Sequence, residues 1–96
     1  MTRYAAKKDT NHGEIQKGLK DTFGPDAVQD VSMYPRLGFD LIAIARGRVM
    51  FLEVKQPKKV THLTESEQEA RARYGDYWRV VTTLEEALEA MEAPAP

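Results

Sequence analysis

The sequence predicts a mixed α/β domain in which a central sheet is flanked by helices. Two runs of strand character separated by a short loop lie in the middle of the chain, and further runs of strand character lie on either side of them. Segments with helical periodicity precede, separate and follow these runs, so the predicted order is helix, three strands, helix, strand, helix. Because a helix separates the last strand from the first three, we expect a mixed sheet.

The first helix is expected at residues 12–23. Asn11 and Glu14 have the spacing of a capping box, and Glu14 also lies where an acid favours the helix dipole. Apolar residues recur every four positions until a breaker pair ends the helix, at Ile15, Leu19 and Phe23 and then Gly24-Pro25. A strand with imperfect alternation is expected at 27–34, and a turn then leads to Asp40.

An antiparallel hairpin is predicted from residues 39–45 and 49–54. Both runs are rich in β-branched, aromatic and other apolar residues, and the short loop between them contains a glycine. Both faces of this hairpin are apolar, which is typical of central strands that are covered on two sides. The end of the hairpin nevertheless carries charge, at Asp40, Glu53 and Lys55.

The length of the loop decides how these charges meet. A two-residue loop at 46–47 places Asp40 opposite Glu53, whereas a loop one residue later places Asp40 opposite Lys55. Either register puts the three charges on one face, because side chains alternate along a strand and opposed residues share a face. A three-residue loop places Asp40 opposite Val54 and separates the cluster, unless a bulge restores it.

Three charges at the end of an apolar hairpin need a physical reason. Burying Asp40, Glu53 and Lys55 is costly unless they are paired, hydrated or bound to a metal. Two convergent carboxylates can hold Mg²⁺, which prefers oxygen ligands, and a nearby lysine can orient a water or stabilise a phosphoryl transition state. The alternative interpretation is a salt bridge at a strand end. The Glu-x-Lys triplet alone does not decide against it, because such a triplet is a weak signal for a metal site. We favour the metal site.

The second half of the chain is expected to form a helix, a strand and a further helix. Thr64 and Glu67 have capping-box spacing, which predicts a helix at 65–74 that stops at a glycine. An aromatic and β-branched strand is expected at 77–81. The capping pattern recurs from Thr83, and an apolar stripe of helical spacing follows it, at Leu84, Ala87, Leu88 and Met91.

Three short motifs follow one another along the chain: Gly38-Phe39-Asp40, then Glu53-Val54-Lys55, then Leu63-Thr64 through Gln68. Together they resemble the PD-(D/E)xK nuclease superfamily, and within it the virus-type replication-repair nuclease (VRR-NUC) domain. The resemblance spans about residues 12–88 and implies a restriction-endonuclease-like αβββαβ core with an extra C-terminal helix. The sequence departs from the family pattern at Phe39, where the family usually has proline. Because that proline takes no part in the chemistry, the departure bears on how the chain enters the strand more than on the activity.

The resemblance also implies roles for individual residues. Asp40 and Glu53 would bind a divalent cation, Mg²⁺ or Mn²⁺, with the backbone carbonyl of Val54 as a further ligand. Lys55 would be the catalytic lysine. The catalytic set that the resemblance predicts is therefore concentrated at the end of the hairpin.

Two further positions match the family pattern, one on each helix beside the hairpin. Glu14 on the first helix would contribute to the metal site, and its contribution to the helix dipole is the competing interpretation. Gln68 on the second helix would direct its amide at a water or a phosphate, and a plain surface position is the competing interpretation.

Basic residues near the predicted site are candidates for contacts with a phosphate backbone. A simple connection or a solvated surface is the alternative for each of them. Net charge does not decide the matter, because the whole chain carries −1 and residues 1–79 carry +3. The candidates are Arg36, Lys58, Lys59 and Arg71.

The chain has 96 residues, which predicts a single nuclease domain at 1–96, with a flexible arm at 1–10 and a frayed tail at 93–96. It has no cysteine, and therefore no disulfide framework and no thiolate zinc site. No apolar run approaches the roughly 20 residues of a membrane span and no signal peptide is apparent, so we expect an intracellular, cytoplasmic protein without a membrane partner.

The predicted function is that of an Mg²⁺-dependent endonuclease acting on DNA. The resemblance further implies a homodimer that cuts branched DNA such as four-way junctions, which suits paired cuts in two strands. A non-catalytic nucleic-acid-binding or assembly module that keeps the fold is the main alternative. A small protein-interaction subunit that uses the amphipathic last helix is a third possibility.

Overall fold

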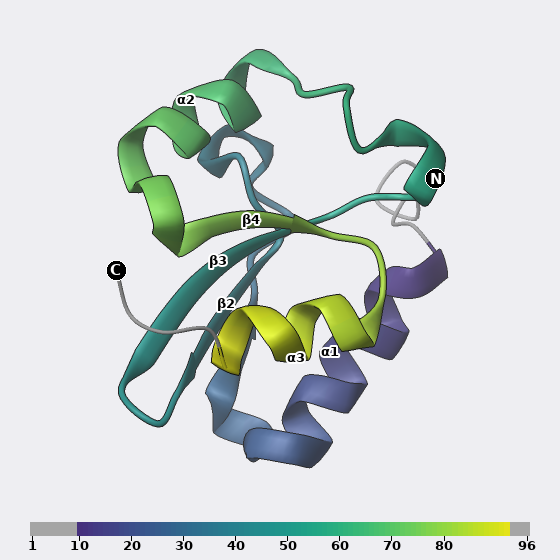
Figure 1. Cartoon of the computed structure of the whole chain (residues 1–96), viewed down its shortest axis with the longest axis vertical. Helices are drawn as coiled ribbons and strands as arrows, with labels where there is room; N and C mark the ends of the chain where they lie inside the picture. The colour runs from purple at the N-terminus through teal and green to yellow at the C-terminus, as the bar shows by residue number, and fades with distance from the viewer. Residues whose placement is uncertain (1–9, 93–96) are drawn as a thin grey trace.

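A four-stranded mixed sheet with helices against both faces forms the part of the chain that the computed structural model describes, residues 10–92 (Figure 1). The predicted order of helices and strands is confirmed. The predicted tail at 93–96 lies outside the described residues, as does the predicted arm up to residue 9. The elements are α1 (Thr10–Phe23), β1 (Val28–Asp30), β2 (Leu41–Ala45), β3 (Arg48–Val54), α2 (Glu65–Tyr74), β4 (Trp78–Val81) and α3 (Leu84–Glu92), with short 3₁₀ helices η2 (Pro25–Ala27), η3 (Pro35–Leu37), η4 (Pro57–Lys59) and η5 (Gly75–Tyr77).

The strands lie in the order β1-β2-β3-β4, in which the first three are antiparallel and β4 runs parallel to β3. The mixed sheet follows from the connection between β3 and β4, because a parallel neighbour requires a crossover and α2 supplies it. The hairpin strands β2 and β3 are central, as their two apolar faces predicted. The C-terminal ends of β3 and β4 therefore meet at one end of the sheet, and the hairpin turn lies at the other.

The two faces of the sheet are covered by different helices (Figure 1). Side chains of α1 and α3 pack with strand residues in one apolar core, which includes Ile15, Leu19, Leu41, Leu52 and Ala87. Residues of α2 pack on the opposite face in a second core, which includes Ala70, Phe39 and Trp78. The apolar stripes of α1 and α3 thus face the core, as their periodicity predicted.

The hairpin turn consists of Arg46 and Gly47, so the first of the predicted registers is confirmed. Ala45 pairs with Arg48, and Leu41 pairs with Leu52. Both turn residues have positive φ, 55° and 77°, as two-residue hairpin turns of the favoured twist require. The register places Asp40 beside Glu53 at the far end of the hairpin.

The chain bends where it enters β2. The Asp40 N–H donates to the Leu52 carbonyl at 2.8 Å, although Leu52 is the register partner of Leu41, so two residues oppose one as in a β-bulge. Phe39 accordingly packs in the core under α2, whereas Leu41 packs on the opposite face. The strand predicted at 39–45 therefore begins at Leu41. Because of the bend, the side chains of residues 39–41 do not follow the strict alternation of a regular strand.

Gly38 fixes this bend against α2 and β4. Its φ is 80°, and a Cβ added there would collide with the carbonyl oxygen of Ser66. The indole Nε1–H of Trp78 donates to the Gly38 carbonyl at 2.8 Å. The entry to β2 is thus held from both neighbouring elements just before Asp40.

Replacing Gly38 by alanine is expected to destabilise the protein by roughly 2–4 kcal/mol, because it combines positive φ with a backbone collision. Gly47→Ala is the matched control, since Gly47 also has positive φ but has nothing within 4 Å of an added Cβ. That control should lose only roughly 1 kcal/mol. Urea unfolding measures both, and equal losses would show that packing around Gly38 does not hold the strand entry.

The predicted boundaries of the first helix and the first strand are also wrong. The first helix begins at Thr10, so Asn11 lies inside the helix and does not cap it, and the first turn contains no acid. The strand predicted at 27–34 ends at Asp30, because the Asp30 carboxylate accepts the Ser32 N–H at 2.9 Å and Tyr34 N–H then closes a turn. In both cases a polar side chain makes a hydrogen bond that the local pattern did not indicate.

Arg48, at the start of β3, ties the sheet to the end of α3. Its side chain is buried, and its Nε–H donates to the Ala90 carbonyl at 2.8 Å. Carbonyls in the last turn of a helix lack intrahelical partners and attract a cation. The C-terminal end of α3 therefore lies beside the hairpin turn, at the end of the sheet opposite to Asp40.

Candidate active site

Asp40, Glu53 and Lys55 come together at the end of the sheet where β3 and β4 finish. One carboxylate oxygen of Asp40 accepts the N–H of Val54 at 2.9 Å, which fixes this carboxylate beside the last residue of β3. Glu53 is buried, at 7% exposure, in the penultimate position of the same strand. Lys55 follows directly, and its N–H donates to the Val81 carbonyl at 3.1 Å. The backbone of two strands thus positions all three side chains.

The ammonium of Lys55 lies between two carboxylates. Its Nζ is 3.0 Å from Oε1 of Glu67 on α2 and 3.9 Å from Oε2 of Glu53. All three side chains are nearly buried, with 9–12% of their surface exposed. Glu67 is therefore the closer partner of Lys55, and the sequence predicted it only as a helix-capping residue.

Burial and crowding hold a proton on Glu53. Removal from water is the largest cause, and the nearby carboxylates of Asp40 and Glu67, together with a hydrogen bond from Glu53 to Glu67, add to it. These effects raise the pKa of Glu53 from its ordinary value of 4.5 to about 9, although Lys55 opposes them. Without a metal, the three carboxyl groups of Asp40, Glu53 and Glu67 therefore face the single positive charge of Lys55.

The pKa of Asp40 is also raised, chiefly by burial. The Val54 N–H and His12 oppose the rise, whereas the charges of Glu67 and Asp30 add to it. The pKa of Asp40 is thus influenced by charged groups on both faces of the sheet, Glu67 on α2 and His12 on α1. Asp40 is thus at the centre of the charged cluster.

A second pair of polar groups, His12 and Asp30, lies on the α1 side. His12 is buried, at 3% exposure, and its Nε2 is 3.3 Å from Oδ2 of Asp30. The other oxygen of Asp30 accepts hydrogen bonds from the N–H and the hydroxyl of Ser32, at 2.9 and 2.6 Å. The Asp40 carbonyl accepts the Val31 N–H at 2.8 Å, which places Asp30 next to Asp40.

Asn11 fastens the first turn of α1 to the ends of both parallel strands. Its side-chain amide donates to the Lys55 carbonyl at 3.1 Å and to the Thr82 carbonyl at 2.7 Å. Both acceptors lie just beyond the strands, where backbone carbonyls no longer have ladder partners. The backbone of Lys55 is therefore held by α1 as well as by β4.

Two predicted site residues do not join the cluster. Glu14 is exposed on α1, whereas His12 is the residue that the helix buries toward Asp30. Gln68 is exposed, and its amide donates to the Leu63 carbonyl at 3.0 Å. On α2 the side chain that reaches the cluster is Glu67, the neighbour of Gln68.

Sequence signals for the missed residues exist in retrospect. His12 precedes Ile15 and Leu19 by three and seven positions, which places it on the buried stripe of α1. Glu67 occupies the capping-box position that points back toward the start of α2, and this start lies over the end of the sheet. Helical phase, applied to polar residues, would have found both.

The predicted basic contacts are all exposed but lie in different places. Lys58 and Lys59 belong to η4, in the loop that follows Lys55. Arg36 belongs to η3, in the turn before Asp40. Arg71 lies in the last turn of α2, beside a groove lined by η5 and β4. Arg36, Lys58 and Lys59 thus lie in connections next to Asp40 and Lys55 along the chain, whereas Arg71 lies one turn beyond Glu67 on α2.

The donor set fits a hard divalent cation with an incomplete protein shell. Asp40 and Glu53 offer carboxylate oxygens, and the crowding that raises the pKa of Glu53 would be relieved by positive charge. Among residues 10–92 no three His, Cys, Asp or Glu side chains form a group that could hold a metal ion. A cation here would therefore depend on two carboxylates, a backbone carbonyl and waters, as Mg²⁺ sites commonly do.

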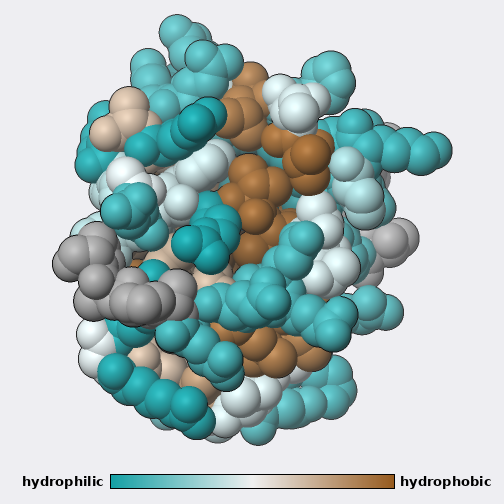
Figure 2. Space-filling view, viewed as in Figure 1, coloured by the Kyte–Doolittle hydropathy of each residue, from teal (hydrophilic) through white to brown (hydrophobic). Residues whose placement is uncertain are grey.

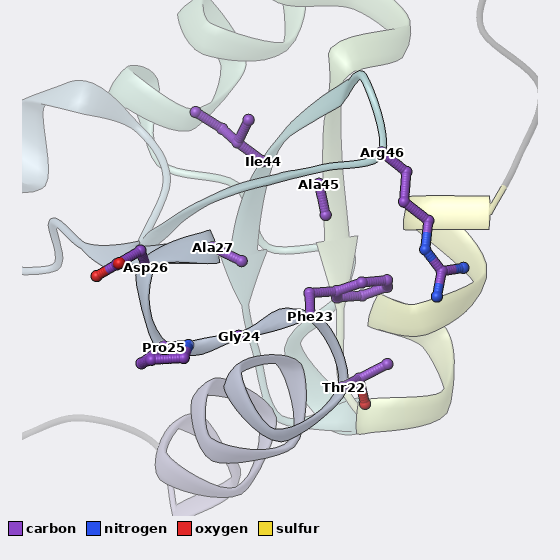
Figure 3. Close-up of a pocket in the computed structure, with 9 residues that line it drawn as sticks. All are labelled: Thr22, Phe23, Gly24, Pro25, Asp26, Ala27, Ile44, Ala45 and Arg46. Carbon is purple, nitrogen blue, oxygen red and sulfur yellow. The ribbon is translucent and has the colours of Figure 1, made fainter.

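Two grooves among residues 10–92 are lined by residues other than Asp40, Glu53 and Lys55. One, of about 570 Å³, is lined by the end of α1 and the hairpin turn, where the Arg46 guanidinium lies 5.1 Å from the centre of the Phe23 ring (Figure 3). Another, of about 460 Å³, lies along the edge strand β4 and is lined by Val60, Val80 and Glu86 among others. In the view of Figure 2, apolar surface lies near the middle of the molecule and is bordered by polar side chains.

No protein-family model, no curated protein and no solved structure matches this chain in three comparisons. No helix within residues 10–92 is long and apolar enough to cross a membrane. A functional proposal therefore depends on the fold and on the chemistry of the charged cluster.

Proposed function

We propose that this chain is a metal-dependent nuclease that hydrolyses DNA phosphodiester bonds. The observation that carries the proposal is the convergence of Asp40, Glu53 and Lys55 at one end of the sheet, with the pKa of Glu53 raised to about 9. Such crowding of carboxylates works against folding and is typical of a functional site. The element order and strand directions are those expected of a restriction-endonuclease-like core, which supports the same proposal.

In the proposed mechanism, Asp40, Glu53 and the Val54 carbonyl would hold Mg²⁺ or Mn²⁺. When bound, the cation would polarise the phosphate and supply a water of lowered pKa. Lys55 presents its ammonium at the same place, where it would hold a water and stabilise negative charge that develops on the phosphate. The Val54 N–H keeps the Asp40 carboxylate in position, and Asn11 keeps the backbone of Lys55 in position.

The resemblance to VRR-NUC domains extends the proposal to branched DNA and to a homodimer. The exposed Lys58 and Lys59 follow the site directly, and Arg36 precedes it, so positive charge lies on both sides of the cluster along the chain. These residues would contact phosphates. Glu14, Gln68 and Arg71 are exposed, and the proposed chemistry assigns no role to them.

Cleavage assays test the proposed function directly. Labelled linear duplex, single strand and four-way junction would each be incubated with the protein and Mg²⁺, Mn²⁺ or EDTA. Cutting that requires a divalent cation supports the proposal, and the preferred substrate defines its class. Absence of cutting on all three substrates with both metals would overturn it.

A non-catalytic nucleic-acid-binding module is the second candidate, and one observation favours it. Glu67 lies 3.0 Å from Lys55, so the lysine already has an ion-pair partner without a metal. A binding module should show no cation site that depends on Asp40 and Glu53. Calorimetric titration with Mn²⁺ separates the two candidates, because the nuclease should lose its binding in Asp40→Asn.

The two lysines of η4 should contribute to DNA affinity through charge alone. Replacing Lys58 and Lys59 by alanine is expected to weaken binding to all sequences and to reduce the slope of log affinity against log salt by roughly 2. Lys17→Ala is the control, since Lys17 is exposed on α1 and paired with Asp21 at 2.7 Å. Fluorescence anisotropy at several salt concentrations measures the slope. An unchanged slope would remove these lysines from the DNA contact.

A further inference from the structure

Glu67 makes two contacts with the same carboxylate oxygen. Its Oε1 accepts the Thr64 N–H at 2.9 Å, which is half of the capping box of α2. The same oxygen lies 3.0 Å from Nζ of Lys55. Glu67 is 8% exposed, so this carboxylate joins the start of α2 to the end of β3 in a nearly dry environment.

The helix cap does not explain the charge of Glu67. Glutamine serves equally well at this position of a capping box, because its side-chain oxygen can accept the same hydrogen bond. The reciprocal bond, from the Glu67 N–H to the Thr64 hydroxyl at 3.2 Å, uses only backbone of Glu67. A buried carboxylate costs free energy that a glutamine would avoid. An acid in the first turn also favours the helix dipole, but the exposed start of many helices offers that gain without burial, so the ion pair with Lys55 is the specific reason for a buried negative charge here.

The ion pair also links the two ends of the segment between β3 and α2. Lys55 is the first residue of this segment, directly after β3, and Glu67 lies in the first turn of the helix that follows it. Between them are η4 and the exposed Lys58 and Lys59. The direction of the Lys55 side chain is thus tied to a helix end and is not left to the flexible lysine stem.

We propose that Glu67 is a positioning residue that holds the Lys55 ammonium at the carboxylate cluster, a role that rests on the proposed nuclease function. Glu67 acts through Lys55 and does not itself touch substrate. The separation of 3.9 Å between Lys55 and Glu53 leaves the ammonium beside the proposed cation site without a close bond to a proposed metal ligand. Loss of the Glu67 charge would therefore release Lys55 and would also alter the hydrogen bond between Glu53 and Glu67, whereas the Asp40 carboxylate would stay fixed by the Val54 N–H.

The test compares Glu67→Gln with Thr64→Ala. Glu67→Gln keeps the cap and removes the charge, so kcat for DNA cleavage should fall roughly 10- to 100-fold while KM changes less than about threefold. Thr64→Ala removes the other half of the cap, so it should lower the Tm but keep kcat. In a Lys55→Ala background, Glu67→Gln should cause no further loss of kcat, because the two residues act as one unit.

A second measurement uses the metal-free protein without DNA. The side-chain ¹⁵Nζ–H signal of Lys55 is expected to be visible by NMR in the wild type and in Thr64→Ala, because a held ammonium exchanges its protons slowly, and to be lost in Glu67→Gln. A wild-type kcat in Glu67→Gln, or an unchanged Lys55 signal, would overturn the inference and leave the nuclease intact. Absence of cutting by the wild type would instead overturn the nuclease, and the NMR signal would then decide the ion pair alone.

Discussion

Lys55→Ala and Asp40→Asn are each expected to lower the rate of DNA cleavage by roughly 100- to 1,000-fold. Lys55 supplies the only ammonium found within 4 Å of Glu53 in the described residues 10–92, and Asp40 is the carboxylate fixed by the Val54 N–H. Charge that stabilises a transition state in a dry site typically accounts for effects of this size. The rates would be measured on the preferred substrate with Mg²⁺ and with Mn²⁺.

Gln68→Ala is the informative companion to these substitutions. Gln68 matches the family pattern, but in the structure its amide donates to the Leu63 carbonyl and its side chain is exposed. We therefore expect the rate to stay within about threefold of the wild type. A loss for Gln68→Ala comparable to that for Lys55→Ala would show that Gln68 moves into the site when DNA binds. Retained activity in Asp40→Asn would remove this carboxylate from the mechanism.

Glu53→Gln is expected to stabilise the metal-free protein while abolishing its cation binding. The folded protein keeps a proton on Glu53 until the pH approaches about 9, whereas the unfolded chain releases it near 4.5. Folded protein thus binds more protons than unfolded chain in this window, so stability should fall as pH rises through it, by at most about 1.4 kcal/mol per pH unit. Glutamine mimics the protonated form, so the variant should lose this slope.

Urea unfolding in EDTA between pH 5 and 9 measures the slope, and Glu89→Gln on the exposed side of α3 is the control. Adding Mg²⁺ or Mn²⁺ should raise the stability of the wild type, and more so at pH 8 than at pH 6, because the cation competes with the proton on Glu53. Glu53→Gln should show little response. A flat pH profile for the wild type would mean that Glu53 is already ionised without metal.

The middle of the chain was predictable because local and long-range signals agree there. A glycine in a short loop and two apolar runs specify the hairpin, and the structure selects Arg46 and Gly47 as the turn. Thr64 and Glu67 specify the start of α2, and the structure contains both hydrogen bonds of that capping box. The strand order also follows from the crossover through α2.

The composition of the charged cluster was only partly predictable. Asp40, Glu53 and Lys55 share a hairpin, so their meeting follows from strand geometry, with the bulge at Asp40 as a correction. His12 and Glu67 come from helices on opposite faces of the sheet, and their approach depends on how α1 and α2 are phased and docked. Such docking is decided by side-chain packing over the whole sheet and not by any local motif.

The positions at which the described chain begins and ends have a practical consequence for handling the protein. Asn11, in the first turn of α1, touches the backbone of Lys55, whereas Ala90, near the end of α3, accepts a bond from Arg48 beside the hairpin turn. The two ends of the described chain thus lie at opposite ends of the sheet (Figure 1). A fused reporter attached close to residue 92 would therefore lie away from the charged cluster, whereas one attached close to residue 10 would lie beside it.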